Sequence, residues 1–382
     1  PHGDAAIGDA LVNLGQKDLL IDCQGNWGDI RTGDSAAAPR YIEARLTKFA
    51  LEVAINPQTT NWQVSYDGRR NEPICLPVKF PLVLAQGVEG IAVGLATKIL
   101  PHNFVELIQA SIKVLEGKKF KLYPDFQTGG MMDAGDYQSG LRGGKIRVRV
   151  KIDKLDKSTL VIREIPYGVT TGTLMESIVK ASEKGQIKIK KLSDNTAAEV
   201  EVLIELQPGV SPDQTIDALY AFTQCETSIS PNSCVIIDNK PVFLAVEEIL
   251  RQSTFYTQEL LRQELTIRLG ELQEKWHFAS LEKIFIEKRI YRDIEECETW
   301  EDVIDVIGLG LAKYIATPSS KTKADKRLLL HRDITVEDIQ RLTEIRIKRI
   351  SKYNSFQADE LILGIETELT QVRHDLAHLT EY

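Results

Sequence analysis

The stretch from Asp34 to Leu46, DSAAAPRYIEARL, holds the residues with the clearest capacity for chemistry. At its centre Arg40 directly precedes Tyr41, and the small residues from Ser35 to Ala38 leave room for a bulky partner to approach. A tyrosine hydroxyl titrates near pH ~10 and is a weak nucleophile at neutral pH, but an adjacent guanidinium offers a planar fork that fits phosphate oxygens. The pair therefore suits attack on a phosphodiester, with the broken strand captured covalently on the tyrosine oxygen.

The same stretch also has a plainer interpretation, which its spacing alone favours. Residues Arg40 to Leu51 have the pattern of an amphipathic helix in which Tyr41 only packs. On that helix Arg45 and Lys48 would lie near the exposed side, close enough to Tyr41 to contact phosphates. A solvated helix face explains these two cations equally well.

A short helix is expected near the start of the chain. Asp4 is its expected N-cap and Gly15 its expected end. Apolar residues at helical spacing predict a buried stripe at Ile7, Leu11 and Leu14. Small side chains at its N-terminus would let this helix approach an anion or lie in a DNA groove, although an ordinary amphipathic helix has the same pattern.

Two later segments combine apolar residues with turn signals or with cations. Gly90 and Gly94 enclose Ile91, which stands either at the tip of a tight turn or in a buried strand, and composition favours the strand. From Lys145 to Ile152 apolar and cationic residues alternate, which predicts a half-buried strand with one cationic face. That face could support DNA, or it could simply be solvated.

Beyond Pro241 the pattern becomes that of long helices. Apolar residues recur at helical spacing among many charges from Leu265 to Ala279 and again from Leu361 to Leu379. Narrow apolar seams of this kind predict two long helices that pair in antiparallel fashion. Shorter helices are expected between them, from Trp300 to Ile350, with a polar loop near residues 317–326.

Composition restricts the class of protein. The chain has 382 residues, of which 43% are hydrophobic, and a net charge of −8. A negative total is unusual for a DNA-binding protein, but residues 111–191 carry 17 Lys and Arg against 9 Asp and Glu, and distant charges are screened beyond about 10 Å. No run approaches the ~20 apolar residues of a membrane helix. Five cysteines without CxxC spacing predict reduced thiols in a cytoplasmic protein.

Five segments, in chain order, resemble the breakage-reunion region of type IIA DNA topoisomerases. They are HGDAAIGDAL, DCQGNWGDI, GDSAAAPRYIEARL, GVEGIAVGLATKILPHN and LVIREIPYGV. The resemblance runs over nearly the whole chain. It is greatest to the A subunits of bacterial topoisomerase IV, with the gyrase A subunits as near relatives.

The resemblance implies an α+β multidomain fold. Residues 1–76 would form a winged-helix domain that carries the catalytic tyrosine and lacks its N-terminal part. Residues 77–243 would form a mixed α/β tower. Residues 244–382 would form a long antiparallel coiled-coil arm with a helical exit-gate domain, where two copies of the chain meet. Candidates for that dimer contact are Ile304, Ile307 and Leu309.

The family's reaction implies a role for each candidate residue of the site. Tyr41 would attack a DNA phosphorus and take the 5′ end as a phosphotyrosyl ester, while Arg40 would stabilise charge on the phosphate oxygens. His2 matches a family histidine near the scissile phosphate that positions it or shuttles a proton. Ile91 resembles the isoleucine that wedges between base pairs and bends the duplex.

The first helix would be the family's recognition helix, with Asp4 and Ala5 against DNA, and Arg45 and Lys48 would contact phosphates. In bacterial relatives this helix carries a serine and, one turn later, an acid, which anchor a water–metal bridge to quinolone inhibitors. Asp9 matches the acid, but Ala5 occupies the serine position and has no hydroxyl. We therefore expect quinolones to stabilise cleaved DNA only weakly, because one hydrogen bond of the bridge is missing.

No cofactor is expected on this chain itself. It contains no DxD or HExxH pattern and no GxxxxGK[ST] nucleotide loop. By resemblance, Mg²⁺ and ATP belong to a partner B subunit. The expected partners are double-stranded DNA, a second copy of the chain and the B subunit, in an A2B2 heterotetramer that decatenates and relaxes DNA. This assembly would act on the cytoplasmic nucleoid, without a membrane.

Three alternatives stay open besides the topoisomerase IV interpretation. A gyrase A subunit would introduce supercoils. A non-enzymatic DNA-bending protein would account for the apolar wedge and the paired helices. A coiled-coil structural dimer without DNA would account for the negative charge. A covalent DNA adduct through Tyr41 separates the enzymes from the two non-enzymatic proteins, and salt-dependent DNA binding separates those two from each other.

Overall fold

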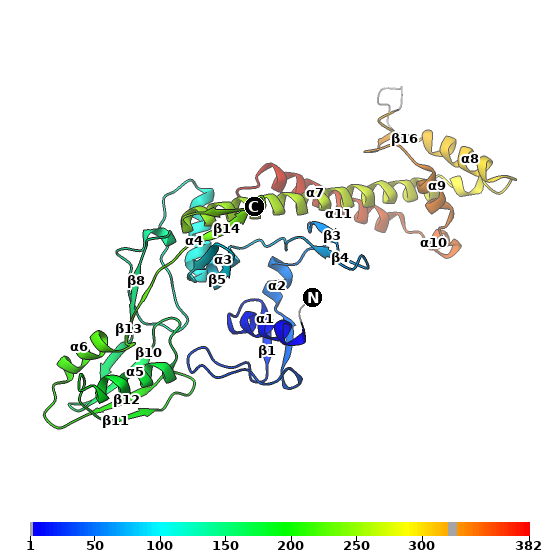
Figure 1. Ribbon diagram of the computed structural model, residues 1–382. Helices are drawn as coiled ribbons and strands as arrows, with labels where there is room; N and C mark the ends of the chain where they lie inside the picture. The colour runs from blue at the N-terminus through cyan, green and yellow to red at the C-terminus, as the bar shows by residue number, and fades with distance from the viewer. Residues whose placement is uncertain (1–2, 320–326) are drawn as a thin grey trace. The chain divides into compact units, whose positions relative to one another are not determined.

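The computed structural model describes residues 3–319 and 327–382 (Figure 1). The chain forms two compact units, Pro1–Gln258 and Glu259–Tyr382. The long helix α7 (Val246–Glu287) begins in the first unit and continues in the second. Among the described residues, no helix is both long enough and apolar enough to cross a membrane.

The first residues of the chain build a small α/β element around Tyr41. Its parts are α1 (Asp4–Gln16), β1 (Ile21–Gln24), the one-turn 3-10 helix η1 (Pro39–Tyr41), β2 (Glu43–Leu46) and α2 (Lys48–Val53). Strands β1 and β2 pair in antiparallel fashion, with Cys23 opposite Ala44. The residues between Gln24 and Glu43 must therefore form one closed loop, and Tyr41 lies near its end.

The single helix expected from Arg40 to Leu51 is wrong, because three elements divide this stretch. Ile42 has extended dihedrals, with φ −122° and ψ 149°, and β2 pairs with β1. Helix α2 then begins at its own N-cap, where the Thr47 hydroxyl accepts a hydrogen bond from the Ala50 amide at 2.9 Å. Strand pairing between segments far apart in sequence overrides the local helical pattern.

Helix α1 is present, but the predictions of its burial and its ends are wrong. Ile7 is 66% exposed and Leu14 38%, so the expected apolar stripe is not buried. The buried residue is Gly15, where a Cβ would lie 2.7 Å from the Trp27 ring, so this glycine is a packing position inside the helix rather than its end. Asp4 is the first helical residue and not the N-cap, because the residue before it already has extended dihedrals.

Two hairpins and two short helices continue the first unit. They are formed by β3 (Trp62–Val64) with β4 (Asn71–Pro73), β5 (Val88–Ala92) with β6 (Leu95–Ile99), α3 (Leu82–Gln86) and α4 (Phe104–Leu115). The aromatic rings of Phe49, Phe80 and Phe104 have centroids 4.8 to 5.7 Å apart. This aromatic cluster attaches α2 to α4 and so joins the Tyr41 region to the hairpins that follow.

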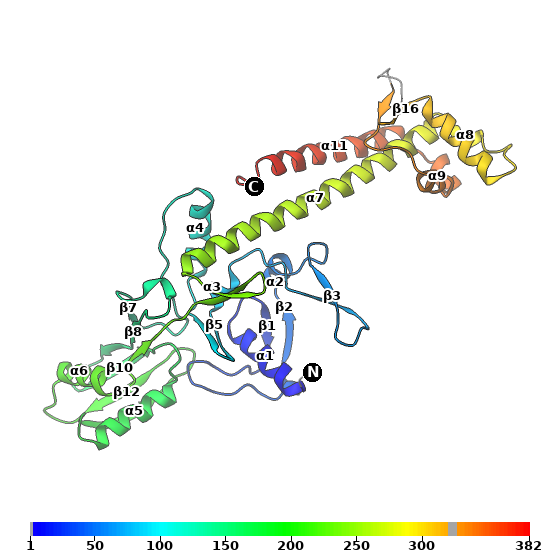
Figure 2. The same ribbon diagram turned by 45° about the horizontal axis from the view of Figure 1, so that its top comes forward.

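Antiparallel sheets occupy the middle of the first unit. Their strands are β7 (Met131–Asp133), β8 (Ile146–Arg149), β9 (Lys151–Lys154), β10 (Thr159–Glu164), β11 (Ile189–Asp194), β12 (Val202–Leu206), β13 (Glu226–Ile229), β14 (Cys234–Ile237) and β15 (Lys240–Phe243). Strand orders are β13-β8-β7 and β11-β12-β10-β9, and β14 pairs with β15. The short η2 (Gln138–Gly140) precedes β8. Helices α5 (Thr171–Glu183) and α6 (Pro212–Phe222) lie beside the four-stranded sheet (Figure 2). They contribute Leu174, Ile178 and Leu219 to its core.

The alternation predicted from Lys145 to Ile152 is confirmed, although two strands share it. Three fully buried residues form its inner side: Ile146, Val148 and Val150. On the outer side Arg147 lies 2.7 Å from Asp133, and Arg149 pairs with Glu226. Each of these two arginines is thus paired with a carboxylate.

In the described residues, the second unit is helical apart from one short parallel strand pair. Its elements after α7 are η3 (Ile290–Arg292), α8 (Trp300–Ala312), β16 (Ile315–Ala316), β17 (Leu328–Leu329), α9 (Val336–Thr343), α10 (Ile347–Ser351) and α11 (Ser355–Ala377). Polar contacts between α7 and α11 join Arg268 with Glu368, Trp276 with Glu366, and Lys283 with Asp359 (Figure 2). The partner numbers fall as the α7 numbers rise, so the predicted antiparallel helix pair is confirmed.

A buried ion cluster fixes α9 against α7 in this unit. Arg332 lies 2.8 Å from Glu274 and 2.6 Å from Asp338, whose side chain is 3% exposed. Burial favours the neutral form of Asp338, but hydrogen bonds from Arg332 and the Thr335 amide outweigh it and lower the pKa of the carboxyl. Removing Arg332 would leave this buried carboxylate in contact with Thr335 and His277 but without its guanidinium. Breaking a buried ion pair in this way typically costs about 3–5 kcal/mol.

His102 is a buried packing residue. It is 4% exposed, and its Nδ1–H donates to the Leu84 carbonyl at 3.2 Å. Its Nε2 accepts from the Tyr137 hydroxyl at 3.4 Å. Burial lowers the pKa of His102 to about 4, so the ring is neutral at pH 7. Asn103, not His102, caps α4.

We expect His102 to make the first unit lose stability as the pH falls from about 6.5 to about 4. The imidazole has a pKa near ~6.5 in the unfolded chain and about 4 in the folded one. The unfolded state therefore binds the extra proton, and the free energy of unfolding falls by up to roughly 3 kcal/mol across this window. Urea unfolding followed by circular dichroism at several pH values measures the loss. His102→Gln should be less stable at neutral pH and show a shallower pH dependence, and an equal slope in both proteins would contradict this assignment.

Candidate active site

Tyr41 ends η1 with its phenol in solvent. The residue is 65% exposed, and the guanidinium carbon of Arg40 lies 4.6 Å from the centre of the tyrosine ring. The cation therefore lies over the face of the ring, where the two attract each other. A guanidinium in this stacked position can still donate through its N–H edges to a phosphate at the hydroxyl. The pair thus leaves both the phenol and the guanidinium edges accessible to a phosphodiester.

The backbone of Gly25 supports the turn that carries Tyr41. Gly25 has φ +94°, and a Cβ there would lie 2.7 Å from the Tyr41 carbonyl oxygen and 3.3 Å from the Ile42 Cα. Only glycine permits both this dihedral and this approach. Within the turn, the Tyr41 amide donates to the Ala38 carbonyl at 2.9 Å. Backbone packing therefore sets the position of the tyrosine.

The loop before Tyr41 has a small core of its own. Trp27 is 6% exposed, and its Nε1–H donates to the Gln24 carbonyl at 3.0 Å. The Asn26 carbonyl accepts from the Ala37 amide at 2.9 Å, which ties the start of the loop to its end. The supporting role of residues 24–28 was not predicted from the sequence. A tryptophan between glycines was the available signal, because a large apolar ring in a tight turn needs a place to pack.

Arg31 attaches this loop to the sheet region of the same unit. Its guanidinium donates to the Ala198 carbonyl at 2.6 Å, and its own carbonyl accepts from the amide of Thr171, the first residue of α5, at 2.8 Å. Asp29 orients the guanidinium at 2.6 Å, and this hydrogen bond lowers the pKa of the Asp29 carboxyl. The loop is therefore held by the buried Trp27 ring within it and by the hydrogen bonds of Arg31 to the sheet region.

Arg45 and Lys48 lie on different elements, so the common helix face predicted for them does not exist. Arg45 is on β2, its side chain is 82% exposed, and it pairs with Asp22 at 2.9 Å. Lys48 is the first residue of α2 and is exposed. An exposed ion pair contributes about 0–1 kcal/mol, so a phosphate can replace Asp22 as the partner of Arg45 with little loss. Both cations remain candidates for phosphate contact.

Helix α1 flanks the turn that carries Tyr41. A Cβ on Gly8 would lie 3.8 Å from the Pro39 Cγ, at the start of η1. Asp4, Ala5 and Asp9 are all exposed on this helix. His2 lies outside the described residues.

The apolar tip at Ile91 is confirmed, and the buried strand that composition favoured is wrong. Ile91 is 92% exposed near the end of β5, and Val93 in the turn is fully exposed. The turn itself uses Gly94, with φ +75°. At the other end of the hairpin, Lys98 and Asn232 exchange two backbone hydrogen bonds of 2.9 and 3.0 Å. An anchored hairpin with two apolar side chains at its tip fits insertion between bases.

The C-terminal end of α1 is attached to the base of this hairpin. The Lys17 ammonium donates to the Gly87 carbonyl at 3.1 Å, and the Gln86 side chain donates to the Asp18 carbonyl at 2.9 Å. Gly87 directly precedes β5. The helix beside Tyr41 and the hairpin that carries Ile91 therefore share one base.

Within the described parts of the chain, no group of three or more His, Cys, Asp or Glu side chains is placed to hold a metal ion. All five cysteines are free thiols, as their spacing predicted.

Comparison with known proteins identifies the family. Residues 1–382 match the family model that describes the A subunit of DNA gyrase/topoisomerase IV. The A subunit of DNA topoisomerase 4 from Borreliella burgdorferi is 39% identical over 382 residues, which cover all of this chain and 59% of that protein. DNA gyrase A subunits of Lawsonia intracellularis and Leptospira biflexa are 31% and 32% identical, over 97% and 92% of this chain.

The chain spans only part of these relatives, 59% of the topoisomerase 4 protein and 45% and 43% of the two gyrase proteins. The match nevertheless covers the tyrosine turn, the exposed hairpin and both helices of the antiparallel pair, because it extends over every residue of the chain. The resemblance seen in the five sequence segments is confirmed. The chain belongs to the family of DNA gyrase and topoisomerase IV A subunits, which are type II topoisomerases.

Proposed function

We propose that this chain is the DNA-cleaving core of a topoisomerase IV A subunit. It makes a transient double-strand break through a 5′-phosphotyrosyl link, lets a second duplex pass and reseals the break. The observation that carries this proposal is the exposed phenol of Tyr41 on a backbone-fixed turn, with the Arg40 guanidinium 4.6 Å from its ring centre. The higher identity to the topoisomerase 4 protein, 39% against 31% and 32%, favours topoisomerase IV over gyrase.

The reaction is a pair of transesterifications. The Tyr41 oxygen forms a bond to the phosphorus as it loses its proton, and the bond from phosphorus to the 3′ oxygen breaks. That 3′ oxygen takes up a proton and leaves as a free hydroxyl. One phosphoester replaces another, so the reverse step reseals the strand without a further reactant. Two copies of the chain, one for each strand, complete the double-strand break.

Neighbouring residues bind and orient the phosphates. Arg40 donates to the oxygens that carry charge in the transition state. Arg45 exchanges its contact with Asp22 for a phosphate, and Lys48 adds a second positive charge. Helix α1 enters a groove of the DNA with Asp4 and Ala5 at its exposed N-terminal end, as recognition helices do.

Several family properties remain predictions for this chain. His2 positions the phosphate or moves a proton. The described residues offer no metal site of their own, and we derive no step through a metal on this chain. Mg²⁺ and ATP belong to the B subunit of an A2B2 heterotetramer, which works in the cytoplasm on the nucleoid. Ala5 and Asp9 account for a weak response to quinolones.

The second unit remains the proposed place of the dimer contact, but one of its predicted candidates is wrong. Ile307 is completely buried in the core of its own chain and cannot contact a partner. Leu309, two residues later on α8, is 69% exposed. It is the apolar side chain of α8 best placed for a contact between copies.

Replacing Tyr41 tests the proposal directly. In the full-length protein, in complex with its B subunit, Tyr41→Phe should reduce covalent DNA adducts by more than about 10³-fold while DNA binding stays nearly unchanged, because only the nucleophilic oxygen is lost. Denaturing gels of end-labelled duplex measure the adduct. Tyr66→Phe is the matched control, since Tyr66 is 98% exposed and lies outside the site. Adducts that persist in Tyr41→Phe would refute the assignment.

Gly25 tests whether backbone packing positions the nucleophile. Gly25→Ala should lower the rate of adduct formation at least about tenfold, because the new Cβ meets the Tyr41 carbonyl oxygen at 2.7 Å. The control Gly68→Ala also places alanine at positive φ, +69°, but nothing lies within 4 Å of its Cβ. It should cost about 1 kcal/mol of stability and leave cleavage unchanged. Equal cleavage rates in both variants would show that the approach at Gly25 is not needed.

Replacing Ile91 tests whether its side chain inserts between base pairs and bends the duplex. Ile91→Ala should reduce DNA bending more than it reduces affinity, since bending costs about 1–6 kcal/mol that an inserted side chain helps to offset. Fluorescence transfer between labelled DNA ends reports the bend. Ile236→Ala is the control, because Ile236 is an isoleucine 69% exposed on β14. A bend that is the same in both variants would remove Ile91 from the DNA contact.

A further inference from the structure

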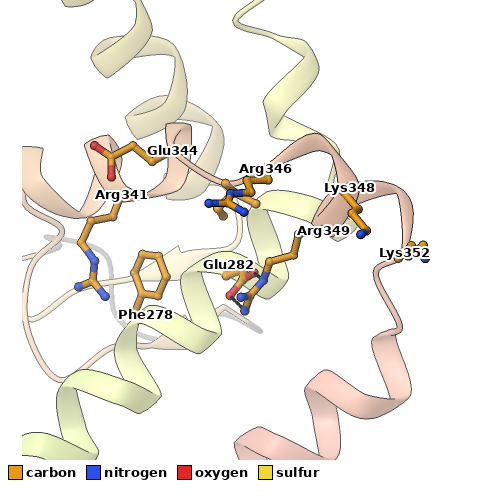
Figure 3. A pocket seen from close by; sticks show the side chains of 9 residues that line it. Phe278, Glu282, Arg341, Glu344, Arg346, Lys348, Arg349 and Lys352 are labelled. Carbon is orange, nitrogen blue, oxygen red and sulfur yellow. Dashed lines mark hydrogen bonds and ion pairs between the residues drawn. The ribbon is translucent and has the colours of Figure 1, made fainter.

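A pocket of about 670 Å³ in the second unit gathers positive charge (Figure 3). The end of α9, the turn after it and α10 line one side, and α7 lines the other. Five cations border the pocket: Arg341, Arg346, Lys348, Arg349 and Lys352. Only two carboxylates, Glu282 and Glu344, face them there.

These cations lie in a part of the chain that is acidic as a whole. Residues 341–352 carry five Lys and Arg and one Glu, whereas residues 245–382 as a whole carry 20 Lys and Arg against 26 Asp and Glu. Arg147 and Arg149 in the first unit each have a carboxylate partner. The pocket is therefore a local positive region that general solubility does not require.

Two of the five cations are fixed by contacts inside the pocket. Arg349 pairs with Glu282, whose side chain is 10% exposed, through an Nη2–Oε2 hydrogen bond of 2.8 Å. The Arg341 guanidinium lies 3.9 Å from the centre of the Phe278 ring. Stacking on a ring orients a guanidinium while its N–H edges can still donate. These contacts hold the guanidiniums of Arg341 and Arg349 in place.

The other three cations are not neutralised within the described residues. Arg346, Lys348 and Lys352 are exposed, and no ion pair joins any of them to a carboxylate of the described chain. Figure 3 shows Arg341 at one end of the pocket, Lys352 at the other and Arg346 and Arg349 between them. The cations are spread along the pocket instead of converging on one point.

We infer that this pocket binds the phosphate backbone of double-stranded DNA. A set of separate cations spread along a pocket matches a polyanion that carries a charge about every 1.7 Å of its axis, whereas one isolated phosphate would need donors that converge. The inference rests on the proposed function, and it adds a duplex contact in the second unit to the one at Tyr41 in the first. Arg346, Lys348 and Lys352 each neutralise one phosphate. Arg341 and Arg349, which are held by Phe278 and Glu282, orient the DNA backbone.

The salt dependence of duplex binding tests this inference in the full-length protein. The pocket variant Arg346→Gln/Lys348→Gln/Lys352→Gln should lower the slope of log affinity against log salt by about 2.7, because each phosphate contact contributes about 0.9. The control Lys275→Gln/Lys313→Gln/Arg373→Gln removes the same charge from three positions of the same unit outside the pocket. Its slope should match that of the unmodified protein. Titration of a labelled blunt duplex by fluorescence anisotropy provides both values.

Adduct formation by Tyr41, measured on the same proteins, separates the inference from the proposed function. A lower slope in the pocket variant, with covalent adducts still formed, supports both. Equal slopes in the pocket and control variants overturn the inference while the adducts leave the proposed function intact. Absence of adducts in the unmodified protein would instead remove the proposed function. If the triple pocket variant fails to fold by circular dichroism, Lys348→Gln alone should lower the slope by about 0.9, and no change would overturn the inference.

Discussion

The pairing of β1 with β2 is the constraint on which the candidate site depends. Because Cys23 is held opposite Ala44, the chain must leave at Gln24 and return at Glu43, and everything between is a closed loop. At the neck of that loop, Gly25 meets the backbone of Tyr41. A nucleophile positioned through its main chain leaves its side chain free, so Tyr41 combines a fixed location with an accessible oxygen.

Several charged side chains of the protein have partners of opposite charge. Arginines beside the sheets are paired with carboxylates, and the buried Asp338 is saturated by Arg332 and backbone donors. Five cations border one pocket between residues 341 and 352, and only two carboxylates face them there. An acidic protein can contact DNA in this way, because short screening lengths let a local group of cations act independently of the net charge.

Features set by neighbouring residues were predictable from the sequence. The Arg40–Tyr41 pair and the long helices α7 and α11 follow from adjacency or helical periodicity. The exposed tip at Ile91 was one of two alternatives that the turn glycines left open, and composition favoured the other. Contacts between distant segments were not predictable. The helix expected after Arg40 gives way to a strand because β1 lies beside it, and the stripe on α1 is exposed because this helix packs through Gly15 instead. Gly25 was missed for the same reason, since its requirement comes from a residue sixteen positions later.

Hydrogen bonds connect the C-terminal end of α1 to the start of the β5–β6 hairpin. Lys17 and Gln86 join the end of the helix to the start of the hairpin, and Gly87 is wedged there, because a Cβ on it would lie 2.9 Å from the Ile99 carbonyl. A force on the hairpin tip would act on α1 through this joint. Since α1 flanks the tyrosine turn at Pro39, a duplex bent by the tip would also load the turn that carries Tyr41. DNA curvature would thereby act as an input to cleavage as well as a result of binding.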